Sequence, residues 1–216
     1  MKKKKVYFFI KRIIDVVLSL IAIIILFIPG VIISICIKVE SKGPVFFKQK
    51  RVGKNKKYFM IYKFRTMRTD TPKDMPTHML NNPDLYITKV GRILRKTSLD
   101  ELPQIINIIK GDMSIIGPRP ALWNQDDLIA ERDKYGANDI KPGLTGLAQI
   151  SGRDELEIPV KAKIDGEYTK NISFLLDVKI FFKTIIKVFE SDGVVEGKVE
   201  EKGEKKIEEN INNGEK

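Results

Sequence analysis

The sequence contains very little of what builds disulfides and metal clusters. Of its 216 residues, one is cysteine (Cys36) and one is histidine (His78). Neither an intrachain disulfide nor a cysteine metal cluster can therefore form. Cys36 lies in an apolar stretch, where a small packed side chain is favoured. His78 lies in a stretch rich in proline and asparagine, where a solvated loop position is favoured.

Negative charge is also scarce relative to positive charge. The chain has 39 lysines and arginines against 28 aspartates and glutamates, a net charge of +11. This excess predicts anionic partners, which are lipid headgroups, phosphorylated substrates or nucleic acid. The sequence has no recognised nucleic-acid-binding motif, and its basic residues cluster around one apolar segment. We therefore expect a membrane surface and phosphorylated molecules as partners, and no nucleic acid.

That apolar segment, residues 13–37, is 25 residues long. As a helix it would measure about 37 Å, which exceeds a hydrocarbon core of about 30 Å. No small-residue cleavage site follows it, which argues against a signal peptide. Pro29 and Gly30 interrupt it, and proline removes a backbone donor and clashes with the preceding turn. Length alone therefore permits a membrane span, but the Pro29-Gly30 pair marks a place to turn.

The charges on both sides of the segment favour re-entry. Basic residues near membrane segments prefer the cytoplasmic side, and here they flank both ends at positions 2–5, 11 and 12, and at 38, 42, 48, 50 and 51. A proline-kinked single span would place one cluster outside. A helix–break–helix that enters and leaves one leaflet keeps both clusters inside. We predict this re-entrant form, with the break at Pro29.

The remaining chain predicts a small α+β domain. Residues 40–67 hold β-branched and aromatic runs that predict a short β-hairpin, with Lys63 on the face opposite Tyr62 and Phe64. Residues 98–113 predict a helix that ends at Gly111. Residues 172–191 have the apolar spacing of an amphipathic helix, with a lysine every four residues.

Adjacent carboxylates, Asp100 and Glu101, stand in "RKTSLDELPQ". A capping role is one interpretation: Ser98 and Glu101 fit a capping box, or Asp100 is itself the cap with Pro103 in the first turn. The other interpretation is a catalytic pair. A helix N-terminus presents bare N–H groups that suit a phosphate, and Arg95 or Lys96 would add positive charge.

Two proline- and glycine-rich motifs follow the acidic pair. In "GPRP" two prolines hold the backbone of Arg119 extended, which suits a bidentate phosphate clamp. The alternative is a solvated arginine on a rigid surface turn. In "KPGLTG" the Pro142-Gly143 pair predicts a type II turn, where the backbone either approaches a ligand or serves as a turn alone.

These motifs, taken in order, resemble the bacterial sugar transferases, the monotopic phosphoglycosyl transferases. The resemblance covers about residues 11–188 and rests on "KRIIDVVLSL", the proline-broken segment, "GPVFFKQKRVGKN", "YKFRTM", "TSLDELPQIINIIKGDMSIIGPRP", "KPGLTGLAQISGR" and "DVKIFFKTI". The short chain is similar to the minimal, single-domain form. It departs from the pattern at Ile28, where some relatives have serine, and at Leu147, where a tryptophan often stands.

The resemblance implies a membrane enzyme that moves a sugar-1-phosphate from a UDP-sugar to polyprenol phosphate. The products would be polyprenyl-diphosphate-sugar and UMP, and Mg²⁺ the cofactor. Asp100 would be the nucleophile, form a covalent phospho-sugar intermediate and contact Mg²⁺. Glu101 would take the proton of the acceptor or orient it. The residues expected near phosphate are Lys63, Arg95, Arg119 and Arg153.

The domain organisation expected on this basis has three parts. They are a basic head with a re-entrant membrane helix (1–39), a cytoplasmic catalytic domain with amphipathic interfacial helices (40–190), and a charged disordered tail (191–216). The protein would sit on the cytoplasmic face of the bacterial inner membrane, bind anionic lipid and pass its product to downstream glycosyltransferases. The competing hypothesis is a membrane-anchored lipid- or protein-binding module without catalysis, in which Asp100 and Glu101 are helix caps.

Overall fold

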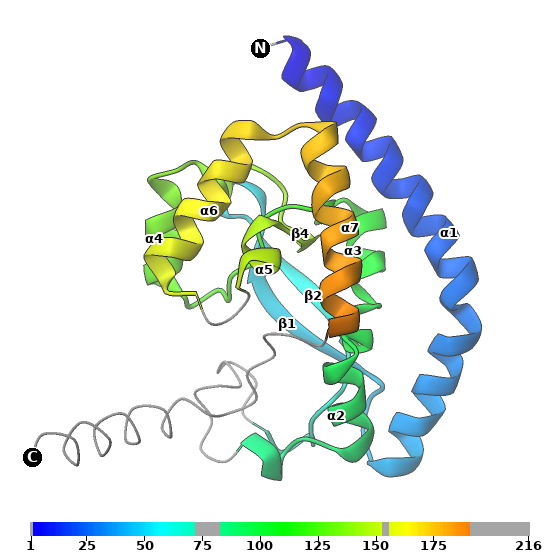
Figure 1. Ribbon diagram of the computed structural model, residues 1–216. Coiled ribbons are helices and arrows are strands. Elements are labelled where there is room, and N and C mark those ends of the chain that lie inside the picture. The colour runs from blue at the N-terminus through cyan, green and yellow to red at the C-terminus, as the bar shows by residue number, and fades with distance from the viewer. Residues whose placement is uncertain (1, 72–82, 153–155, 191–216) are drawn as a thin grey trace, which may run out of the picture.

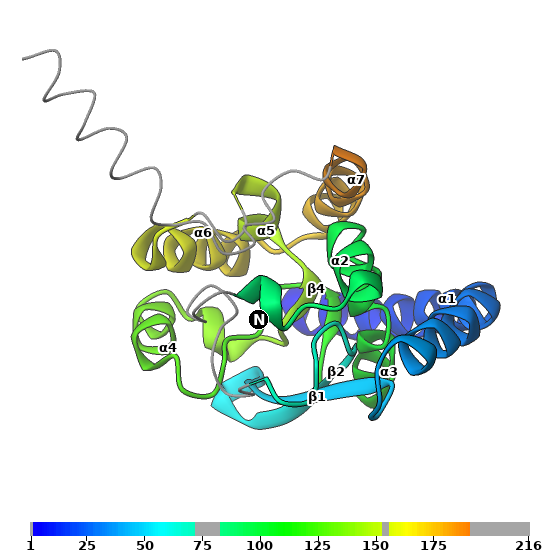
Figure 2. The same cartoon turned by 90° about the horizontal axis from the view of Figure 1, so that it is seen from below.

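The computed structural model describes residues 2–71, 83–152 and 156–190. It confirms a mixed α+β fold in which helices surround two small sheets (Figures 1 and 2). The elements are α1 (Lys2–Glu40), β1 (Phe46–Val52), β2 (Tyr58–Phe64), α2 (Lys89–Lys96), α3 (Gln104–Lys110), β3 (Ser114–Ile116), α4 (Asp126–Asp133), β4 (Gly143–Thr145), α5 (Leu147–Ser151), α6 (Ile158–Asn171) and α7 (Phe174–Glu190). β1 and β2 form the expected antiparallel hairpin, and β3 and β4 form a parallel pair.

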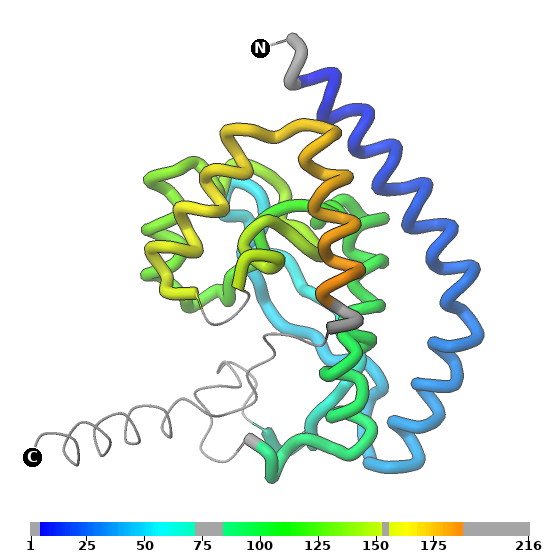
Figure 3. The backbone as a smooth tube through the Cα atoms, viewed as in Figure 1, coloured from blue at the N-terminus to red at the C-terminus, as the bar shows by residue number. Residues whose placement is uncertain are grey.

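The apolar segment is the long helix α1, with 39 residues. Its part from Lys5 to Glu40 is long and apolar enough to cross a membrane. The helix continues through Pro29, so the expected break takes the form of a bend, and α1 bows around one side of the domain (Figures 1 and 3). Proline removes one donor from the helical ladder and forces neighbouring turns apart, which bends a helix without ending it. Beyond the proline, the Ser34 hydroxyl donates to the carbonyl of Gly30 at 2.6 Å.

The first half of α1 is fixed to the domain by polar contacts. The Arg12 guanidinium donates to the carbonyls of Ile108 and Ile109, at the end of α3. The buried Asp15 carboxylate accepts from the Ser114 hydroxyl at 2.8 Å and from the Ile115 amide at 3.1 Å. These bonds join α1 to residues about 100 positions later in the chain.

The last turn of α1 is fixed to the same domain. Arg65, which follows β2 directly, donates to the carbonyls of Ser41 at 2.8 Å and Lys42 at 2.6 Å. Ile37 is buried with Phe64 and Leu94 in one hydrophobic cluster. Between its two anchored ends, α1 exposes large apolar side chains. They include Leu20, Ile21, Ile24, Ile25, Phe27, Ile28 and Ile32.

The hairpin β1–β2 is attached to α3 by one buried side chain. Asn107 of α3 is fully buried, accepts from the amide of Tyr62 at 3.0 Å and donates to the carbonyl of Met60 at 2.8 Å. Side chains alternate along a strand, so Lys63 lies on the opposite face of β2 from Tyr62. This docking holds Lys63 near the turn that precedes α3.

The motifs "GPRP" and "KPGLTG" pack against each other by backbone contact. Gly117 donates to the carbonyl of Thr145, and Gly143 donates to that of Pro118, each at 2.9 Å. A Cβ on Gly143 or Gly146 would lie 2.1 Å from backbone atoms of Gly117. The type II turn predicted at Pro142-Gly143 is therefore wrong: Gly143 begins the extended strand β4, and the glycine is required for close packing of the two loops.

Helix α7 confirms the predicted amphipathic stretch, and its buried face is narrow. Ile180 is fully buried, Asp177 is 9% exposed, and the Thr184 hydroxyl bonds to that of Thr145 at 2.8 Å. Asp177 accepts from the Tyr7 hydroxyl of α1 at 2.5 Å and from Lys11. The exposed surface of the helix carries Lys179 and Lys183 together with large apolar side chains: Phe174, Leu175, Phe181, Phe182, Ile185 and Ile186.

Candidate active site

The acidic pair lies in a short turn between α2 and α3. The sequence instead predicts that the pair belongs to the first turn of a helix over residues 98–113. Helix α2 ends at Lys96, and Ser98 then adopts a left-handed conformation with φ of 57°. Leu99–Glu101 forms a single 3₁₀ turn, and α3 begins after Pro103. The Ser98 side chain makes no capping bond, and the helix-start position of α3 is Pro103. The capping alternative is therefore wrong for Ser98 and Glu101, because the Glu101 carboxylate is engaged elsewhere.

Glu101 is held by two cations. Its Oε1 lies 2.7 Å from Lys63 Nζ and 2.6 Å from an Arg119 nitrogen. A second Arg119 nitrogen donates to Oε2 at 3.3 Å, so the guanidinium contacts both oxygens. Burial alone would raise the pKa of Glu101, but the charges and hydrogen bonds of Arg119 and Lys63 outweigh it and hold that pKa below its usual range. Glu101 is therefore a fixed anion at neutral pH.

Asp100 has a different environment although it is the neighbouring residue. It is 8% exposed, and its Oδ2 lies 3.7 Å from Lys63 Nζ. Among the described residues none forms a hydrogen bond with its carboxylate. Burial raises the pKa of Asp100, and the charge of Lys63 opposes that rise. The carboxylate is thus close to positive charge but keeps its oxygens available.

Arg95 reaches the same region from the last turn of α2. Its Nε donates to the Thr66 hydroxyl at 3.0 Å, and a terminal nitrogen lies 3.2 Å from the Met67 sulfur. Its charge also opposes the rise in the pKa of Asp100. The structure therefore brings together Asp100, Glu101, Lys63, Arg95 and Arg119, from the hairpin, α2, the acidic turn and the "GPRP" loop. Arg153 and His78 lie outside the described residues.

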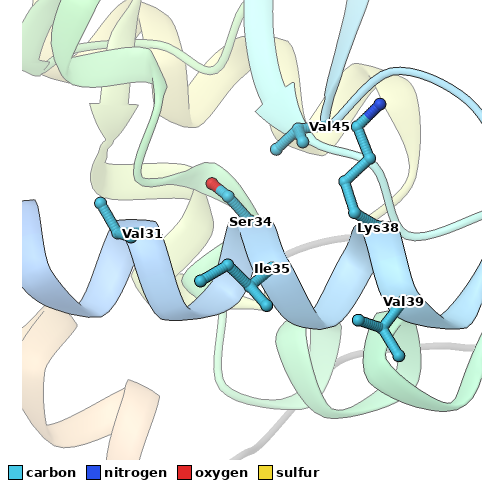
Figure 4. Close-up of a pocket in the computed structure, with 6 residues that line it drawn as sticks. All are labelled: Val31, Ser34, Ile35, Lys38, Val39 and Val45. Atoms are coloured by element: carbon cyan, nitrogen blue, oxygen red, sulfur yellow. The ribbon is translucent and has the colours of Figure 1, made fainter.

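An apolar groove lies on α1, apart from these charged groups. It has a volume of about 380 Å³ and is lined by Val31, Ser34, Ile35, Lys38, Val39 and Val45 (Figure 4). Its wall residue Val45 packs in the same cluster as Ile33, Leu99 and Leu102. The acidic turn is therefore attached to the membrane-competent helix through hydrophobic contacts.

The residues fit a magnesium ion that is shared with a substrate. Mg²⁺ is typically held by one or two carboxylates together with phosphate oxygens and water. Asp100 offers a carboxylate without hydrogen-bond donors, whereas both oxygens of Glu101 are occupied by cations. Within the described part of the chain no group of three or more acidic, histidine or cysteine side chains is placed to enclose a metal. The donor set therefore suits an ion that arrives with phosphate.

Comparison with known proteins assigns the family. Residues 6–191 match the bacterial sugar transferase family. The chain belongs to this family. Its relatives include the uncharacterized sugar transferase EpsL of Bacillus subtilis, 42% identical over 73% of this chain and 76% of the relative. The exopolysaccharide production protein ExoY of Sinorhizobium fredii is 36% identical over 85% of this chain and 87% of its own.

One further relative is a longer protein. It is the UDP-N-acetylgalactosamine-undecaprenyl-phosphate N-acetylgalactosaminephosphotransferase of Aeromonas hydrophila, 40% identical over 83% of this chain and 44% of its own. In this chain the family match, residues 6–191, includes all five residues of the charged cluster.

Several residues that support the cluster in this sugar transferase were not predicted from the sequence. Thr66 holds Arg95, Asn107 holds the hairpin, and Asp15 holds α1. The buried Arg132 and Asp165 pair with each other and contact the "GPRP" loop. None of these residues forms a recognisable motif alone, because the partners named here lie 13 to 100 positions away along the chain. Burial of a polar residue in an apolar run, as for Asp15 in α1, was the available signal.

Proposed function

We propose that this sugar transferase moves a sugar-1-phosphate from a UDP-sugar to polyprenol phosphate, releasing UMP and forming a polyprenyl-diphosphate-sugar. The observation that carries the proposal is the pairing of an available carboxylate, Asp100, with a neighbouring carboxylate locked between Lys63 and Arg119. The name of the Aeromonas relative supports the two substrate classes.

The first step is attack of an Asp100 carboxylate oxygen on the sugar-bearing phosphorus of the UDP-sugar. The new bond is an acyl phosphate, and the bond that breaks joins this phosphorus to the oxygen that leaves with UMP. In the second step a phosphate oxygen of polyprenol phosphate attacks the same phosphorus and releases the Asp100 carboxylate. Mg²⁺, when bound at Asp100, would neutralise charge on the diphosphate.

Glu101 has the properties of an orienting group in this scheme. A general base works best when its pKa lies near the working pH, and the pKa of Glu101 is held below its usual range by Arg119 and Lys63. Of the two roles expected from the sequence, orientation is therefore favoured over proton transfer. Glu101 fixes the Lys63 ammonium and the Arg119 guanidinium beside Asp100, where they meet the phosphate charge.

The same geometry supports a monotopic arrangement on the cytoplasmic face. Both ends of α1 contact one domain, through Arg12 and Asp15 at one end and Arg65 at the other. A straight span would separate these contacts by the thickness of the bilayer. The exposed apolar face of α7, beside α1 in Figure 1, extends the lipid-facing surface, and the net charge of +11 suits anionic headgroups.

The direct test uses membranes containing the protein, polyprenol phosphate and a panel of UDP-sugars. We expect one or a few UDP-sugars to release UMP, and Asp100→Asn to reduce that release by a factor of at least about 10³. In the absence of polyprenol phosphate, intact-protein mass spectrometry should detect one sugar-phosphate on the wild type and none on the variant. Release of UDP would instead indicate direct sugar transfer, and UMP release by Asp100→Asn would exclude this nucleophile.

The competing hypothesis of a binding module without catalysis is disfavoured, because the chain belongs to a family of sugar transferases and Glu101 pairs with Lys63 and Arg119 instead of capping a helix. It predicts no UMP from any sugar nucleotide, and an effect of Asp100→Asn confined to stability.

A further inference from the structure

A buried ion pair lies behind the "GPRP" loop, outside the charged cluster. Arg132 of α4 is 3% exposed and Asp165 of α6 is 1% exposed. Arg132 Nε and a terminal nitrogen donate to the same Asp165 oxygen at 2.8 and 2.5 Å. The two helices that carry the pair, α4 and α6, lie on the far side of the domain from α1 (Figure 1).

Stability alone does not explain why such a pair is buried. Moving each charge out of water is costly, and apolar residues often replace buried ion pairs without loss of stability. The hydrogen bonds of the pair are also incomplete. Only one Asp165 oxygen is used by Arg132, and the other has no hydrogen-bond partner among the described residues. Burial raises the pKa of Asp165 against the opposing charge of Arg132.

The remaining terminal nitrogen of Arg132 points to the charged cluster. It donates to the backbone carbonyl of Arg119 at 2.9 Å. The Arg119 guanidinium in turn donates to both oxygens of Glu101, at 2.6 and 3.3 Å. Asp165 and Arg132 are therefore linked to Glu101 and Lys63 through Arg119, whose backbone carbonyl bonds Arg132 and whose guanidinium bonds Glu101.

Three successive carbonyls of the loop are held from three separate segments. The carbonyl of Pro118 accepts from the Gly143 amide at 2.9 Å, and that of Pro120 accepts from the Arg51 guanidinium at 3.1 Å. The central carbonyl, at Arg119, is the one that Arg132 holds. A planar guanidinium pre-oriented by Asp165 can fix the direction of this carbonyl in a way that a flexible ammonium cannot.

We propose that Arg132 and Asp165 are positioning residues that set the Arg119 guanidinium against Glu101 for the transfer reaction. The proposal rests on the proposed function of the cluster. Arg132 touches no reacting group itself and acts through Arg119. Displacement of a positioned group by about 1 Å costs up to about a hundredfold in rate.

The test replaces the pair with apolar residues of similar size, as Arg132→Met with Asp165→Leu. Removal of both charges leaves no unpaired ion, so the melting temperature should stay close to that of the wild type. UMP release with the accepted UDP-sugar should fall by about tenfold to a hundredfold, mainly in kcat, because the side chains that contact the substrate are retained. Arg132→Lys, which keeps the charge but cannot bond both Asp165 and the Arg119 carbonyl, should show the same loss.

Coupling to Arg119 distinguishes positioning from general support of the fold. In an Arg119→Ala background, formation of the phospho-sugar intermediate should fall no further when Arg132→Lys is added. Lys56→Gln is the matched control, since Lys56 pairs with the exposed Asp133 beside Arg132 at 2.8 Å; its activity should equal that of the wild type.

Three results would overturn the inference. They are unchanged activity in both Arg132 variants, an equal further loss in the Arg119→Ala background, and a loss that tracks melting temperature alone. Failure of the proposed function is recognised separately, because the wild type would then release no UMP from any UDP-sugar.

Discussion

Asp100 and Glu101 are adjacent, both are largely buried, and their pKa values move in opposite directions. The difference lies in their partners. Arg119 contacts both oxygens of Glu101, whereas Asp100 has Lys63 at 3.7 Å and no hydrogen-bond donor among the described residues. One carboxylate is therefore stabilised as an anion, and the other is kept reactive at a cost in stability.

This contrast predicts opposite stability effects for two isosteric substitutions. The raised pKa of Asp100 means that the folded protein favours the protonated carboxyl. The stability that this preference contributes is present below the unfolded pKa of about 3.9 and is lost as the pH rises through the folded pKa. At pH 7, Asp100→Asn should therefore raise the melting temperature, by about 2–4 °C for each ~1 kcal/mol. The measurement is thermal unfolding in detergent without divalent cations, and the gain should shrink towards pH 4.

Glu101→Gln is the comparison. The lowered pKa of Glu101 means that the folded protein favours the ionised carboxylate. The stability that this preference contributes is present above the unfolded pKa of about 4.3 and is lost as the pH falls through the folded pKa. At pH 7 this variant removes the carboxylate that both Lys63 and Arg119 contact, so its melting temperature should fall. Shifts of the same sign in both variants would contradict the assignment of the two environments.

At the scale of elements, the last two residues of β2 and the two that follow them connect α1 to the charged cluster. Lys63 contacts Glu101, Phe64 packs on Ile37, Arg65 donates to carbonyls after α1, and Thr66 accepts from Arg95. Successive side chains of an extended chain point to opposite faces. Four consecutive residues can therefore serve two partners, and the end of α1 and the cluster are fixed to the same strand.

Arg65→Met tests this connection. Arg65 is 5% exposed and donates to the carbonyls of Ser41 and Lys42, which would be left without a charged donor. We expect a loss of about 1–3 kcal/mol in the free energy of unfolding, measured by thermal unfolding in detergent. Arg68→Met is the control, because Arg68 forms an exposed pair with Asp70 and exposed pairs contribute about 0–1 kcal/mol. Equal stability of the two variants would exclude the proposed connection.

At the scale of the whole molecule, the two anchored ends of α1 predict where the termini lie. A tag at Met1 and a tag at Lys216 should both be cytoplasmic, because contacts through Arg12 and Arg65 hold both ends of α1 to one domain. Protease should cut both tags in inverted vesicles and neither in spheroplasts. A periplasmic Met1 would contradict the monotopic arrangement. Pro29→Ala should favour a straight membrane-spanning helix, so that in a fraction of the molecules the N-terminal tag lies on the periplasmic side.

The elements with strong local patterns could be predicted from the sequence. The apolar run of α1, the alternation of β2 and the periodicity of α7 each have a local physical cause, and the acidic pair and "GPRP" could be picked out by residue type. The 3₁₀ turn that holds Asp100 outside α3 begins after the left-handed backbone of Ser98, which propensity does not signal. The β3–β4 pair depends on close approach of Gly117 and Gly143.

Contacts between distant residues were beyond prediction for a related reason. In the sequence, Arg132 and Asp165 are ordinary polar residues of two helices. The ion pair between them forms only because α4 packs on α6. Nothing local in either helix specifies the carbonyl of Arg119 as the third partner.

The contacts of Tyr7 and Lys11 with Asp177 have a consequence for biogenesis. Asp177 follows these residues by 170 and 166 positions. At a synthesis rate of about 5–20 residues per second, it leaves the ribosome roughly 8–34 s after Tyr7. Helix α1 therefore leaves the ribosome well before the last of its partners. Arg12 and Asp15 can bind residues 108–115 as soon as these are synthesised, whereas the contacts of Tyr7 and Lys11 with Asp177 must wait for α7.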